Sequence, residues 1–581
     1  MDTKSQRRST SKRLIFDIET DGLLPDVTKI HLLVTKDIDT QEVTVYNNET
    51  LDAGITALQN ASLLIGHNVI NYDIPVIEKL KRQFIHTTIH DTLVLSRLLF
   101  SNVADLDYSF KRVPGKLIGS HSLKAWGIRL GKHKGDYSEK TDWKEWTPQL
   151  EEYCIQDVEV NHTLYNHLLQ HVISDKAVDI EMRFARLMTE QECAGFKFDI
   201  DKAVELKEYL DNELDVTQSK INEIIPPYDK SLKRRVVTVI FNPRSGDEIA
   251  EHLTKKYGWS PTILTDKGKP KCDEDTLSCL PYPEIPLILH YQQVAKIKGM
   301  LEDGNNSWFK FVGSDGRIHG YVNSCGAVTG RCTHRDPNLA QVPSSKTDLG
   351  SRCRALFTVE DGWKLVGTDA SGLELRCLAH YLYPYDQGEF RDVLLHGDIH
   401  TENQKAFNAN TRTAAKTAIY ALIYGCSPRK LAVTLGRRED EGRELLESYF
   451  KRWPQVRDLI HDVQRKAKSF GYLIGIDGRK LHVRSQHAAL NTLLQSAGAI
   501  VMKVALLRFV YLMNESNKNL GHHYKLVANI HDEFQVECWK YMASNVAELA
   551  IQSIRDAGRA LRFNCPLEGE AKIGDNWAST H

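Results

Sequence analysis

Short apolar stretches next to acidic residues predict strands at three places in the chain. In Leu14–Thr20 polar and apolar positions alternate, which predicts a strand with acidic side chains on one face. The apolar run Leu365–Thr368 ends at Asp369, and a helical pattern begins soon after it. Lys525–Val536 predicts a hairpin of two strands around a tight acidic corner, with Asp532 and Glu533 at its tip. The pattern therefore presents carboxylates at strand ends.

Helical periodicity marks the middle of the chain. Residues 177–192 and 201–225 predict two long helices, the second with a clear apolar face. Two prolines end the second helix, and the basic run Lys230–Arg235 follows. That run suits contact with phosphates, and a solvated surface loop accounts for it equally well. A further predicted helix ends at Tyr291–Met300, so this region has the long, basic-ended helices that a clamp over a duplex backbone needs.

Composition and charge limit the class of protein. A chain of 581 residues is long enough for several domains, and 41% apolar with 26% charged residues is typical of globular proteins. No apolar run reaches the roughly 20 residues of a membrane span, so we expect no membrane contact. The net charge is -1, so nucleic-acid binding would require separated charge. Met1–Arg13 predicts a disordered basic arm, and the 11 cysteines without a CxxC pair indicate free thiols in a reducing cytoplasm.

The N-terminal region carries acids in an order typical of two-metal phosphodiester hydrolysis. They are Asp17, Glu19, Asp73 and Asp157, with Tyr153 one helical turn before Asp157. Carboxylates that share a strand face repel each other unless a cation lies between them. An exposed edge strand is the alternative explanation of the first pair. Asp91, a competing carboxylate, is interpreted as a structural cap.

A second set of chemically suggestive residues lies in the C-terminal half. Asp369 taken alone is explained as an N-cap together with Ser371. A predicted helix adds one stripe of two cations and an aromatic residue, spaced one turn apart: Arg412, Lys416 and Tyr420. Such a stripe is usually a solvated helix face, but here His400 and the acidic corner at Asp532 accompany it. Two acidic corners and a cationic helix form the minimal set for metal-assisted phosphoryl transfer.

These motifs resemble those of the family A DNA polymerases, and among them the replicative polymerases of T-seven-like short-tailed (podovirus) bacteriophages. The polymerase motifs are Thr368–Arg376, Arg412–Gly425 and His531–Glu533, with Thr329–Pro343, Gly478–Lys480 and Asn491–Gly498 as further matching stretches. The ordered acids of the N-terminal region resemble the three motifs of proofreading 3'→5' exonucleases of the ribonuclease-H-like fold. The resemblance covers nearly the whole chain except the N-terminal arm and the middle loops.

The resemblance implies a role for each matching residue of the polymerase motifs. Two metal ions would be held by Asp369, Asp532 and the carbonyl of Ala370, with Glu533 as an accessory carboxylate. The triphosphate would be bound by Arg412, His400 and Lys416, the last also acting in catalysis. Tyr420 would stack on the incoming nucleotide, and Glu374, near Tyr420, would crowd a 2'-hydroxyl. Primer-template DNA would be contacted by Arg331, Gln495, His531 and Tyr424.

For the exonuclease site, the resemblance implies metal binding by Asp17, Glu19, Asp73 and Asp157, with Tyr153 orienting the attacking water. The implied cofactor is Mg²⁺, two ions per active site, with Mn²⁺ as a substitute. The implied partners are primer-template DNA, deoxynucleoside triphosphates and single-stranded DNA at the exonuclease site, with a phage helicase-primase and a single-strand-binding protein as further candidates. The expected location is the cytoplasm of the infected bacterial host.

The expected architecture is a multidomain α/β protein, a ribonuclease-H-like 3'-5' exonuclease domain followed by a right-hand family A polymerase domain. The expected divisions are a basic arm at 1–13, the exonuclease at 14–185, the thumb at 186–310, the palm at 311–395 and 481–581, and the fingers at 396–480. The segment Pro114–Tyr137, rich in Gly, Lys and His, is interpreted either as the wall of a single-strand channel or as a solvated loop beside a buried tryptophan.

Three departures from the family pattern have consequences. Ala421 stands where a glycine usually follows the aromatic residue of the cationic helix. Only the short stretch Lys230–Val239 occupies the place where the phage relatives carry an insertion that recruits host thioredoxin, so we expect no thioredoxin-binding insertion. Tyr420 stands where many relatives have phenylalanine, and its hydroxyl predicts ready acceptance of dideoxynucleotides.

Three rival interpretations are weaker. A stand-alone nuclease does not explain Asp369, Lys416 and Asp532 together. A single-subunit RNA polymerase would share the two aspartates and the cationic helix, but Glu374 and an exonuclease domain argue against it. A non-catalytic DNA-binding scaffold would not need both sets of acids.

Overall fold

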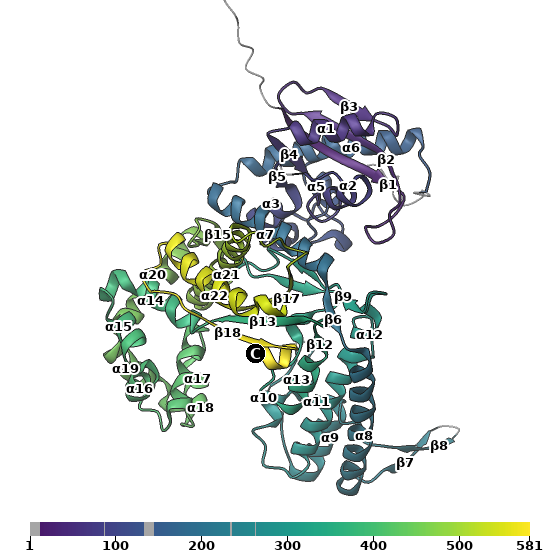
Figure 1. Cartoon of the computed structure of the whole chain (residues 1–581). Coiled ribbons are helices and arrows are strands. Elements are labelled where there is room, and N and C mark those ends of the chain that lie inside the picture. Colours follow the sequence, from purple (N-terminus) through teal and green to yellow (C-terminus); the bar gives the residue numbers. More distant parts are fainter. Residues whose placement is uncertain (1–11, 86, 133–143, 233–234, 262, 266) are drawn as a thin grey trace, which may run out of the picture.

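The computed structural model describes residues 12–85, 87–132, 144–232, 235–261, 263–265 and 267–581, with side chains 230–232 and 235–236 also left aside. Residues 1–11 of the expected basic arm lie outside the described residues, and the first strand, β1 (Arg13–Thr20), already begins at Arg13. Within the described part the chain forms an N-terminal domain placed above a larger body with two arms (Figure 1).

The N-terminal domain is built on a mixed five-stranded sheet in the order β3-β2-β1-β4-β5. The central strand β1 runs antiparallel to β2 and parallel to β4. The other strands are β2 (Ile30–Asp37), β3 (Val43–Tyr46), β4 (Leu63–Gly66) and β5 (Thr88–Asp91). The helices are α1 (Leu51–Asn60), α2 (Asp73–Lys81), α3 (Thr92–Leu99), α4 (Val103–Phe110), α5 (Leu123–Arg129) and α6 (Pro148–Leu169). In β1 Asp17 is partly exposed, whereas Glu19, two residues further along the strand, is buried together with Ile18.

Helix α7 (Asp175–Ala194) joins this domain to the larger body. Val178, Met182 and Ala185 belong to the hydrophobic core of the N-terminal domain. Phe184 and Met188 belong to the core of the C-terminal body. The expected boundary between residues 185 and 186 falls inside this helix, because opposite faces of it are buried in two different cores. The observed helix includes the predicted one at 177–192.

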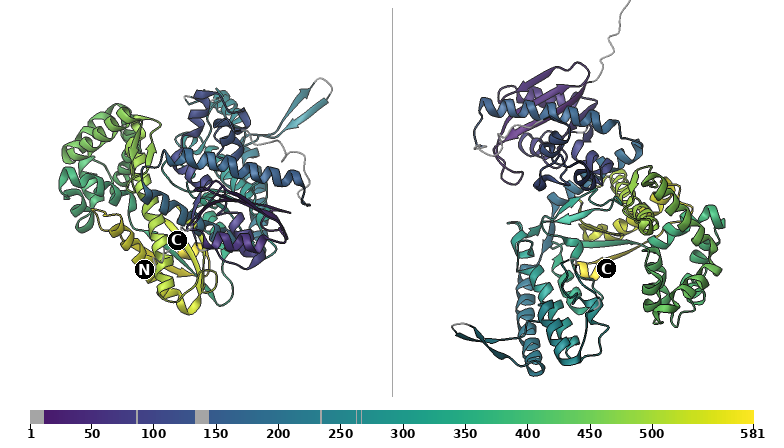
Figure 2. Two further views of the ribbon diagram at one scale, coloured as in Figure 1. Left: turned by 90° about the horizontal axis from the view of Figure 1, so that it is seen from above. Right: turned by 180° about the vertical axis from the view of Figure 1, so that it is seen from behind.

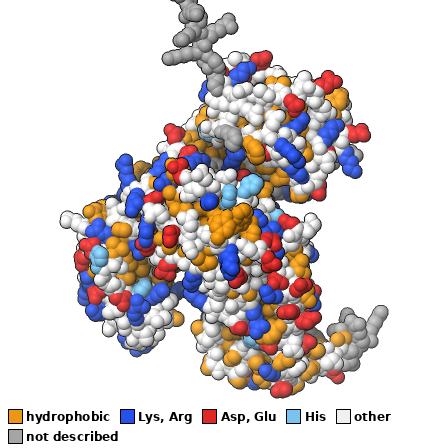
Figure 3. Space-filling view, viewed as in Figure 1, with side chains coloured by type: hydrophobic (Ala, Val, Ile, Leu, Met, Phe, Trp, Pro, Cys, Tyr) orange, Lys and Arg blue, Asp and Glu red, His pale blue; other side chains and the backbone are white. Residues whose placement is uncertain are grey.

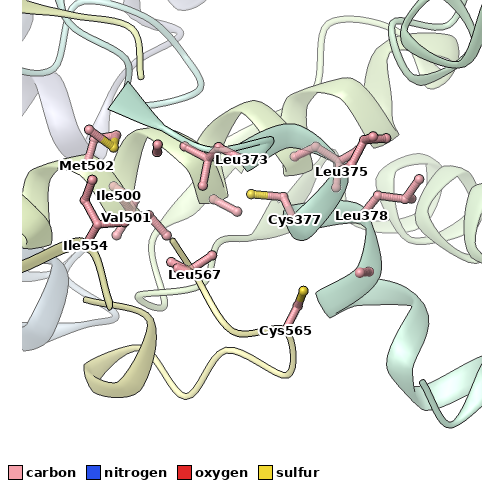
Figure 4. Close-up of a cluster of buried hydrophobic side chains, with 14 of the residues drawn as sticks. Leu373, Leu375, Cys377, Leu378, Ile500, Val501, Met502, Ile554, Cys565 and Leu567 are labelled. Carbon is pink, nitrogen blue, oxygen red and sulfur yellow. The ribbon is translucent and has the colours of Figure 1, made fainter. Parts of the chain in front are cut away.

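The body contains a four-stranded antiparallel sheet in the order β16-β17-β13-β18. Its strands are β13 (Trp363–Ala370), β16 (Tyr524–Ile530), β17 (Glu533–Trp539) and β18 (Gly569–Gly574). Helix α22 (Ala543–Ala560) packs on this sheet, α21 (Ala489–Glu515) packs on α22, and α14 (Leu373–Asp386) packs on α21. Figure 4 shows Leu373, Cys377 and Leu378 of α14 in one buried cluster with Ile500 and Val501 of α21 and Ile554 of α22. This core fixes α14 directly behind the strand that carries Asp369.

Two helical arms extend from opposite sides of this sheet (Figure 1). One arm contains α8 (Ile200–Ile224), α9 (Gly246–Tyr257), α10 (Glu274–Leu277) and α11 (Ile285–Leu301), and the hairpin of β7 (Tyr228–Leu232) and β8 (Arg235–Val239) projects from its end. The other contains α15 (Glu389–His396), α16 (Ile399–Ala406), α17 (Arg412–Ile423), α18 (Pro428–Thr434), α19 (Gly442–Arg452) and α20 (Pro454–Phe470). The first arm is the expected thumb and the second the expected fingers. The predicted helix at 201–225 is confirmed as α8.

Short strands connect the arms to the palm sheet. β6 (Phe196–Phe198) lies between β12 (Phe357–Thr358) and β9 (Arg317–Ile318), so these residues of the expected thumb segment belong to the palm side. β14 (Tyr472–Ile474) pairs with β15 (Lys480–His482), across the expected end of the fingers at 480. A second short hairpin joins β10 (Tyr321–Asn323) to β11 (Thr333–Arg335). The remaining helices of the palm side are α12 (Trp308–Phe311) and α13 (Asp348–Ala355).

One helix, Gln486–Glu515, has the length and apolar character of a membrane span, but 67% of its most apolar window is buried inside the protein. It is the long core helix of the palm, lying within the body in both views of Figure 2. On the face drawn in Figure 3, acidic and basic side chains are interspersed, as a net charge of -1 suggests.

Candidate active sites

The strand register of the palm sheet brings two aspartates together. Asp369, near the end of β13, pairs with Glu533, the first residue of β17. The two-residue turn before β17 contains His531, whose φ of 56° is left-handed, and Asp532. The backbone N–H of Ala370 donates to the backbone carbonyl of Asp532 at 3.0 Å and locks the turn against β13. Asp369 and Asp532 therefore flank one point at the strand ends, as the sequence predicts.

Both aspartates have strongly altered acidity. The surrounding protein desolvates Asp369, and repulsion from Asp532 and Glu533 adds to this, so its pKa rises to about 6. Burial also raises the pKa of Asp532 to about 6, although Arg331 lowers it. Carboxylates that resist ionisation in the free protein gain most from a cation placed between them. The pair therefore suits a divalent metal.

Glu533 differs from the expectation that it would sit with Asp532 at the tip of the hairpin. It is buried within β17 and accepts hydrogen bonds at 2.7 Å from Trp577 Nε1 and from His581 Nδ1. Arg354 lies 3.8 Å from the same carboxylate. Burial alone would raise the pKa of Glu533, but these hydrogen bonds and that of Gln535 lower it. Its carboxylate is thus used to tie the C-terminus to the palm sheet, and the tip of the hairpin is His531 and Asp532.

The cationic stripe forms as predicted on a single helix of the fingers. Arg412 is the first residue of α17, and its guanidinium pairs with Asp398 at 2.9 Å. Asp398 also caps α16, so it holds the beginnings of both helices together. His400 lies in the first turn of α16, and burial, Arg412 and Lys416 all lower its pKa. Three nitrogen-bearing side chains, from Arg412, Lys416 and His400, therefore gather at one end of the fingers.

Glu374, the residue expected to crowd a 2'-hydroxyl, has neighbours on α17 and at its end. Tyr420 is close enough to feel the charge of Glu374, as expected, and burial followed by that charge raises its pKa to about 12. The hydroxyl of Tyr424, one helical turn further along, donates a short hydrogen bond to Oε1 of Glu374. Glu374 is thereby fixed between the palm and the fingers.

The expected DNA-contacting residues lie around the same point. Arg331 lies in the loop between β10 and β11 and influences the pKa of both Asp532 and His531. The side chain of His531 is exposed at the turn. Gln495 is partly exposed on α21, while its neighbours Leu494 and Ser496 are buried. Arg331, His531 and Tyr424 border the aspartate pair, whereas no such contact is seen for Gln495 among the described residues.

A second acidic site lies in the N-terminal domain. Oxygen atoms of Asp17 and Glu19 and the sulfur of Cys154 all lie within 4.8 Å of one another. Cys154 follows Tyr153 on α6, and its thiol donates to Asp17 Oδ2 at 3.4 Å. Asp157, one turn further along the same helix, contributes to the electrostatic field at Cys154. The predicted set of acids thus converges where β1 meets α6.

Asp73 completes this second site at the beginning of α2. Its Oδ1 accepts a hydrogen bond at 3.1 Å from the backbone N–H of Ile18, which lies between Asp17 and Glu19. Burial, followed by repulsion from Asp17, raises its pKa well above the usual range. Asp91 instead caps α3 and accepts from the backbone of Leu93 and Val94, so its interpretation as a structural cap is confirmed.

Several residues of these sites were not predicted. Asp398 and Cys154 are separated in sequence from the partners they contact, and nothing in their local pattern marks them. Trp577 and His581 reach Glu533 only because β18 returns the C-terminus to β13. The only hint in the sequence was that Trp577 and His581, which can form hydrogen bonds, follow the last strand.

An aspartate pair facing a cationic helix, together with a separate acidic site on a mixed sheet, defines a nucleotidyl transferase joined to a nuclease domain. Comparison with known proteins agrees. The family model "DNA polymerase family A" matches residues 188–579, and "RNase_H superfamily" matches residues 14–169. The chain therefore belongs to DNA polymerase family A, and it is a DNA-directed DNA polymerase with a ribonuclease-H-like exonuclease domain.

The chain is similar to DNA-directed DNA polymerases of two phages. It is 34% identical over 710 aligned residues to that of Escherichia phage T7, covering 98% of this chain and 100% of the relative. The same figures hold for Enterobacteria phage T3. The alignment has 710 positions but this chain has 581 residues, so well over a hundred positions of the alignment are gaps in this chain. The thermostable DNA polymerase I of Thermus aquaticus is 30% identical over 58% of this chain and 42% of its own length.

The arrangement of elements is also found in a solved structure. The POL domain of Pol1 from M. smegmatis, in complex with DNA primer-template and dNTP, matches with a TM-score of 0.78. The match covers 98% of this chain and 96% of that one at 20% sequence identity, so it supports the fold alone.

Proposed function

We propose that this polymerase replicates phage DNA in the cytoplasm of an infected bacterial host, extending a primer at Asp369 and Asp532 and proofreading at Asp17, Glu19, Asp73 and Asp157. The observation that carries the proposal is the register that sets Asp369 against the turn of Asp532, close to α17, whose Tyr420 feels the charge of Asp532. Family A polymerases and ribonuclease-H-like domains use divalent metals.

Mg²⁺ is the metal we propose at both sites, with Mn²⁺ as a substitute. At the polymerase site the donors are the carboxylates of Asp369 and Asp532 and the carbonyl of Ala370, and Mg²⁺ prefers oxygen ligands. The raised pKa of both aspartates fits a pair that is built to share cations. Two bound ions would lower the pKa of the attacking 3'-hydroxyl and stabilise the leaving pyrophosphate. Lys416, exposed on α17, adds positive charge where the triphosphate would lie.

The incoming nucleotide would be held by the fingers. Arg412, His400 and Lys416 suit the triphosphate, and Arg412 exchanges Asp398 for a phosphate when the nucleotide arrives. Tyr420 would stack on the base or sugar. The hydrogen bond from Tyr424 holds Glu374 where a 2'-hydroxyl would come, so deoxynucleotides are favoured. These contacts assign substrate choice to the gap between α14 and α17.

Primer-template DNA and dNTP are bound in the structural neighbour from M. smegmatis, and we propose the same ligands here because this chain belongs to DNA polymerase family A. Arg331, Gln495, His531 and Tyr424 are the residues that we assign to the primer-template, through acceptors that all correct base pairs share in the minor groove. A helicase-primase and a single-strand-binding protein are proposed as partners on the resemblance to phage replicative enzymes. At the exonuclease site, Tyr153 would orient the attacking water.

The test is primer extension by the double variant Asp17→Ala/Glu19→Ala. The proposal predicts that this protein extends a matched primer on a single-stranded template and no longer degrades it. A protein that neither extends nor degrades would contradict the division of labour between the two acidic sites. Primer extension by the Asp369→Asn variant would contradict the assignment of Asp369 to the polymerase site.

A further inference from the structure

A large cavity lies between the exonuclease domain and the palm. Its volume is about 1610 Å³, above the range of pockets that hold small molecules. One wall contains Leu23 and Tyr72, which lie next to the metal-binding acids in sequence, four residues after Glu19 and directly before Asp73. The opposite wall is the hairpin of β10 and β11. The cavity therefore begins at the edge of the exonuclease site and ends at the palm.

The hairpin on the opposite wall also reaches the polymerase site. Its loop carries Arg331, which lies close enough to Asp532 to lower the pKa of that residue. Successive side chains of its strands point to opposite faces. Tyr321, Asn323 and Arg335 line the cavity, whereas Val322 is buried in the palm core. The hairpin of β10 and β11 thus places its loop near the polymerase site and one of its faces in the cavity that leads to the exonuclease site.

Two side chains on this face form a stacked pair. Tyr321 and Arg335 are directly opposite each other in the strand register, and Arg335 Cζ lies 4.1 Å from the centre of the tyrosine ring. Arg97 of α3, from the exonuclease domain, donates to the Tyr321 hydroxyl at 3.2 Å. The ring is therefore held from both domains, while the side chain of Arg335 stays 64% exposed and pairs with Asp336. A ring and guanidinium already fixed in place lose little entropy when a ligand stacks on them.

The rest of the lining suits a polyanion with exposed bases. Its cations are Arg97, Lys124 and Arg335, and its acids are Glu192 and Asp315. Three cations against two acids give the lining a small positive balance with its histidines neutral, and Asp315 also lies 3.1 Å from His319. Lys124 belongs to the segment for which the sequence suggested either a channel wall or a solvated loop; residues 119–124 line the cavity, and Trp126 is buried away from it.

We propose that Tyr321 and Arg335, supported by Arg97, form a binding station for unpaired nucleotides of single-stranded DNA whose 3' end occupies the exonuclease site. Aromatic and guanidinium faces bind unpaired bases by stacking without regard to sequence, and arginine also pairs with the phosphates. Duplex DNA does not fit this role, because its base faces are covered by neighbouring pairs. The inference rests on the proposed proofreading function and adds a site upstream of the cleaved bond.

The test is the dependence of single-strand hydrolysis on length. In the wild-type protein, an oligonucleotide of about ten residues should have a KM about tenfold below that of one of about three, which does not reach the station. Arg335→Ala and Tyr321→Ala should abolish most of this gain, and Tyr321→Trp should retain it by stacking. The matched control is Arg352→Ala, which removes an arginine 4.5 Å above Tyr209 and away from the cavity. It should keep the full gain.

Binding measured without catalysis separates this inference from the proposed function. A fluorescent oligonucleotide of about ten residues, titrated in the presence of a chelator, should bind Arg335→Ala about tenfold more weakly than wild type. If wild type degrades no DNA but this difference persists, the proofreading function fails and the station stands. If wild type degrades DNA and Arg335→Ala shows the wild-type length dependence and affinity, the station is refuted.

Discussion

The two aspartates of the polymerase site make the metal-free protein sensitive to pH. Each has a pKa of about 6 in the fold, against 3.8 for an unperturbed aspartate. Between these values the folded state binds more protons than the unfolded state, so the free energy of unfolding falls as the pH rises through this window. A divalent metal bound to the ionised carboxylates would reverse this loss.

We therefore predict that Mg²⁺ raises the Tm of the Asp17→Ala/Glu19→Ala protein more at about pH 7.5 than at about pH 5. Thermal denaturation with and without the metal measures the difference. Adding Asp369→Asn should reduce the metal-dependent increase near neutral pH. An equal increase at both pH values would contradict the linkage between these aspartates and the metal.

Glu374 and Tyr424 determine the choice of sugar in this account. Glu374→Ala removes the carboxylate that faces the sugar and should raise the ratio of kcat/KM for ribonucleotides over deoxynucleotides roughly tenfold or more. Tyr424→Phe keeps the ring but frees Glu374, and should produce a smaller increase in the same direction. Single-nucleotide incorporation by both variants measures it. An unchanged ratio in Glu374→Ala would assign selection to another residue.

Tyr420 has a hydroxyl that is protonated at neutral pH, as tyrosines ordinarily are, and burial raises its pKa further to about 12. It is thus available to replace the contact that a missing 3'-hydroxyl would make. We predict that wild type incorporates dideoxynucleotides readily and that Tyr420→Phe discriminates against them more strongly. Termination frequencies on one template compare the two proteins, and equal discrimination would refute the role of the hydroxyl.

At the scale of elements, the C-terminal segment stabilises the palm through Glu533. Glu533→Ala would leave Arg354 buried without its carboxylate and Trp577 without its acceptor, so we predict a loss of about 3 kcal/mol in the free energy of unfolding. Glu251→Ala is the control, since the Glu251–Lys255 pair is exposed and its loss should leave the free energy of unfolding nearly unchanged. Denaturant unfolding distinguishes them; similar losses would show that the buried network contributes little.

The elements divide into those that periodicity predicts and those that it does not. The helices α7 and α8 were predicted within two residues or so of their observed ends, because a strong apolar face specifies a long helix. The hairpin around Asp532 was predicted as well, but the position of Glu533 was not, because its burial depends on residues 577 and 581, which only the folded sheet brings near. The local pattern of apolar and polar residues predicts a helix or strand, whereas the residues that contact it are determined by the tertiary fold.

The same limit applies to the sites at the scale of the whole molecule. The acids of the exonuclease site were assembled correctly from an ordered resemblance, since β1, α2 and α6 meet in one domain. The cavity between the domains had no comparable signal, because Arg97 and Tyr321 lie more than two hundred residues apart in the sequence. The expected domain boundary at 185 falls inside α7 for a related reason: residues of this one helix belong to the cores of both domains.

The short hairpin β7–β8 at the end of the thumb leads to a prediction about processivity. Only these two strands separate α8 from the segment leading to α9, where the sequence indicated a missing insertion. We predict that host thioredoxin does not lengthen the products of this polymerase on a long single-stranded template. Gel analysis of product lengths with and without thioredoxin measures this, and a clear thioredoxin-dependent increase would contradict it.

The central claim is that one chain edits and extends the same primer at two separate acidic sites. It is tested most directly with a primer that ends in a 3' mismatch, incubated with and without dNTPs. Wild type should trim the mismatch and then extend; Asp369→Ala should only trim; Asp17→Ala should trim poorly and so extend little. Efficient trimming by Asp17→Ala, or extension by Asp369→Ala, would contradict the assignment of the two sites.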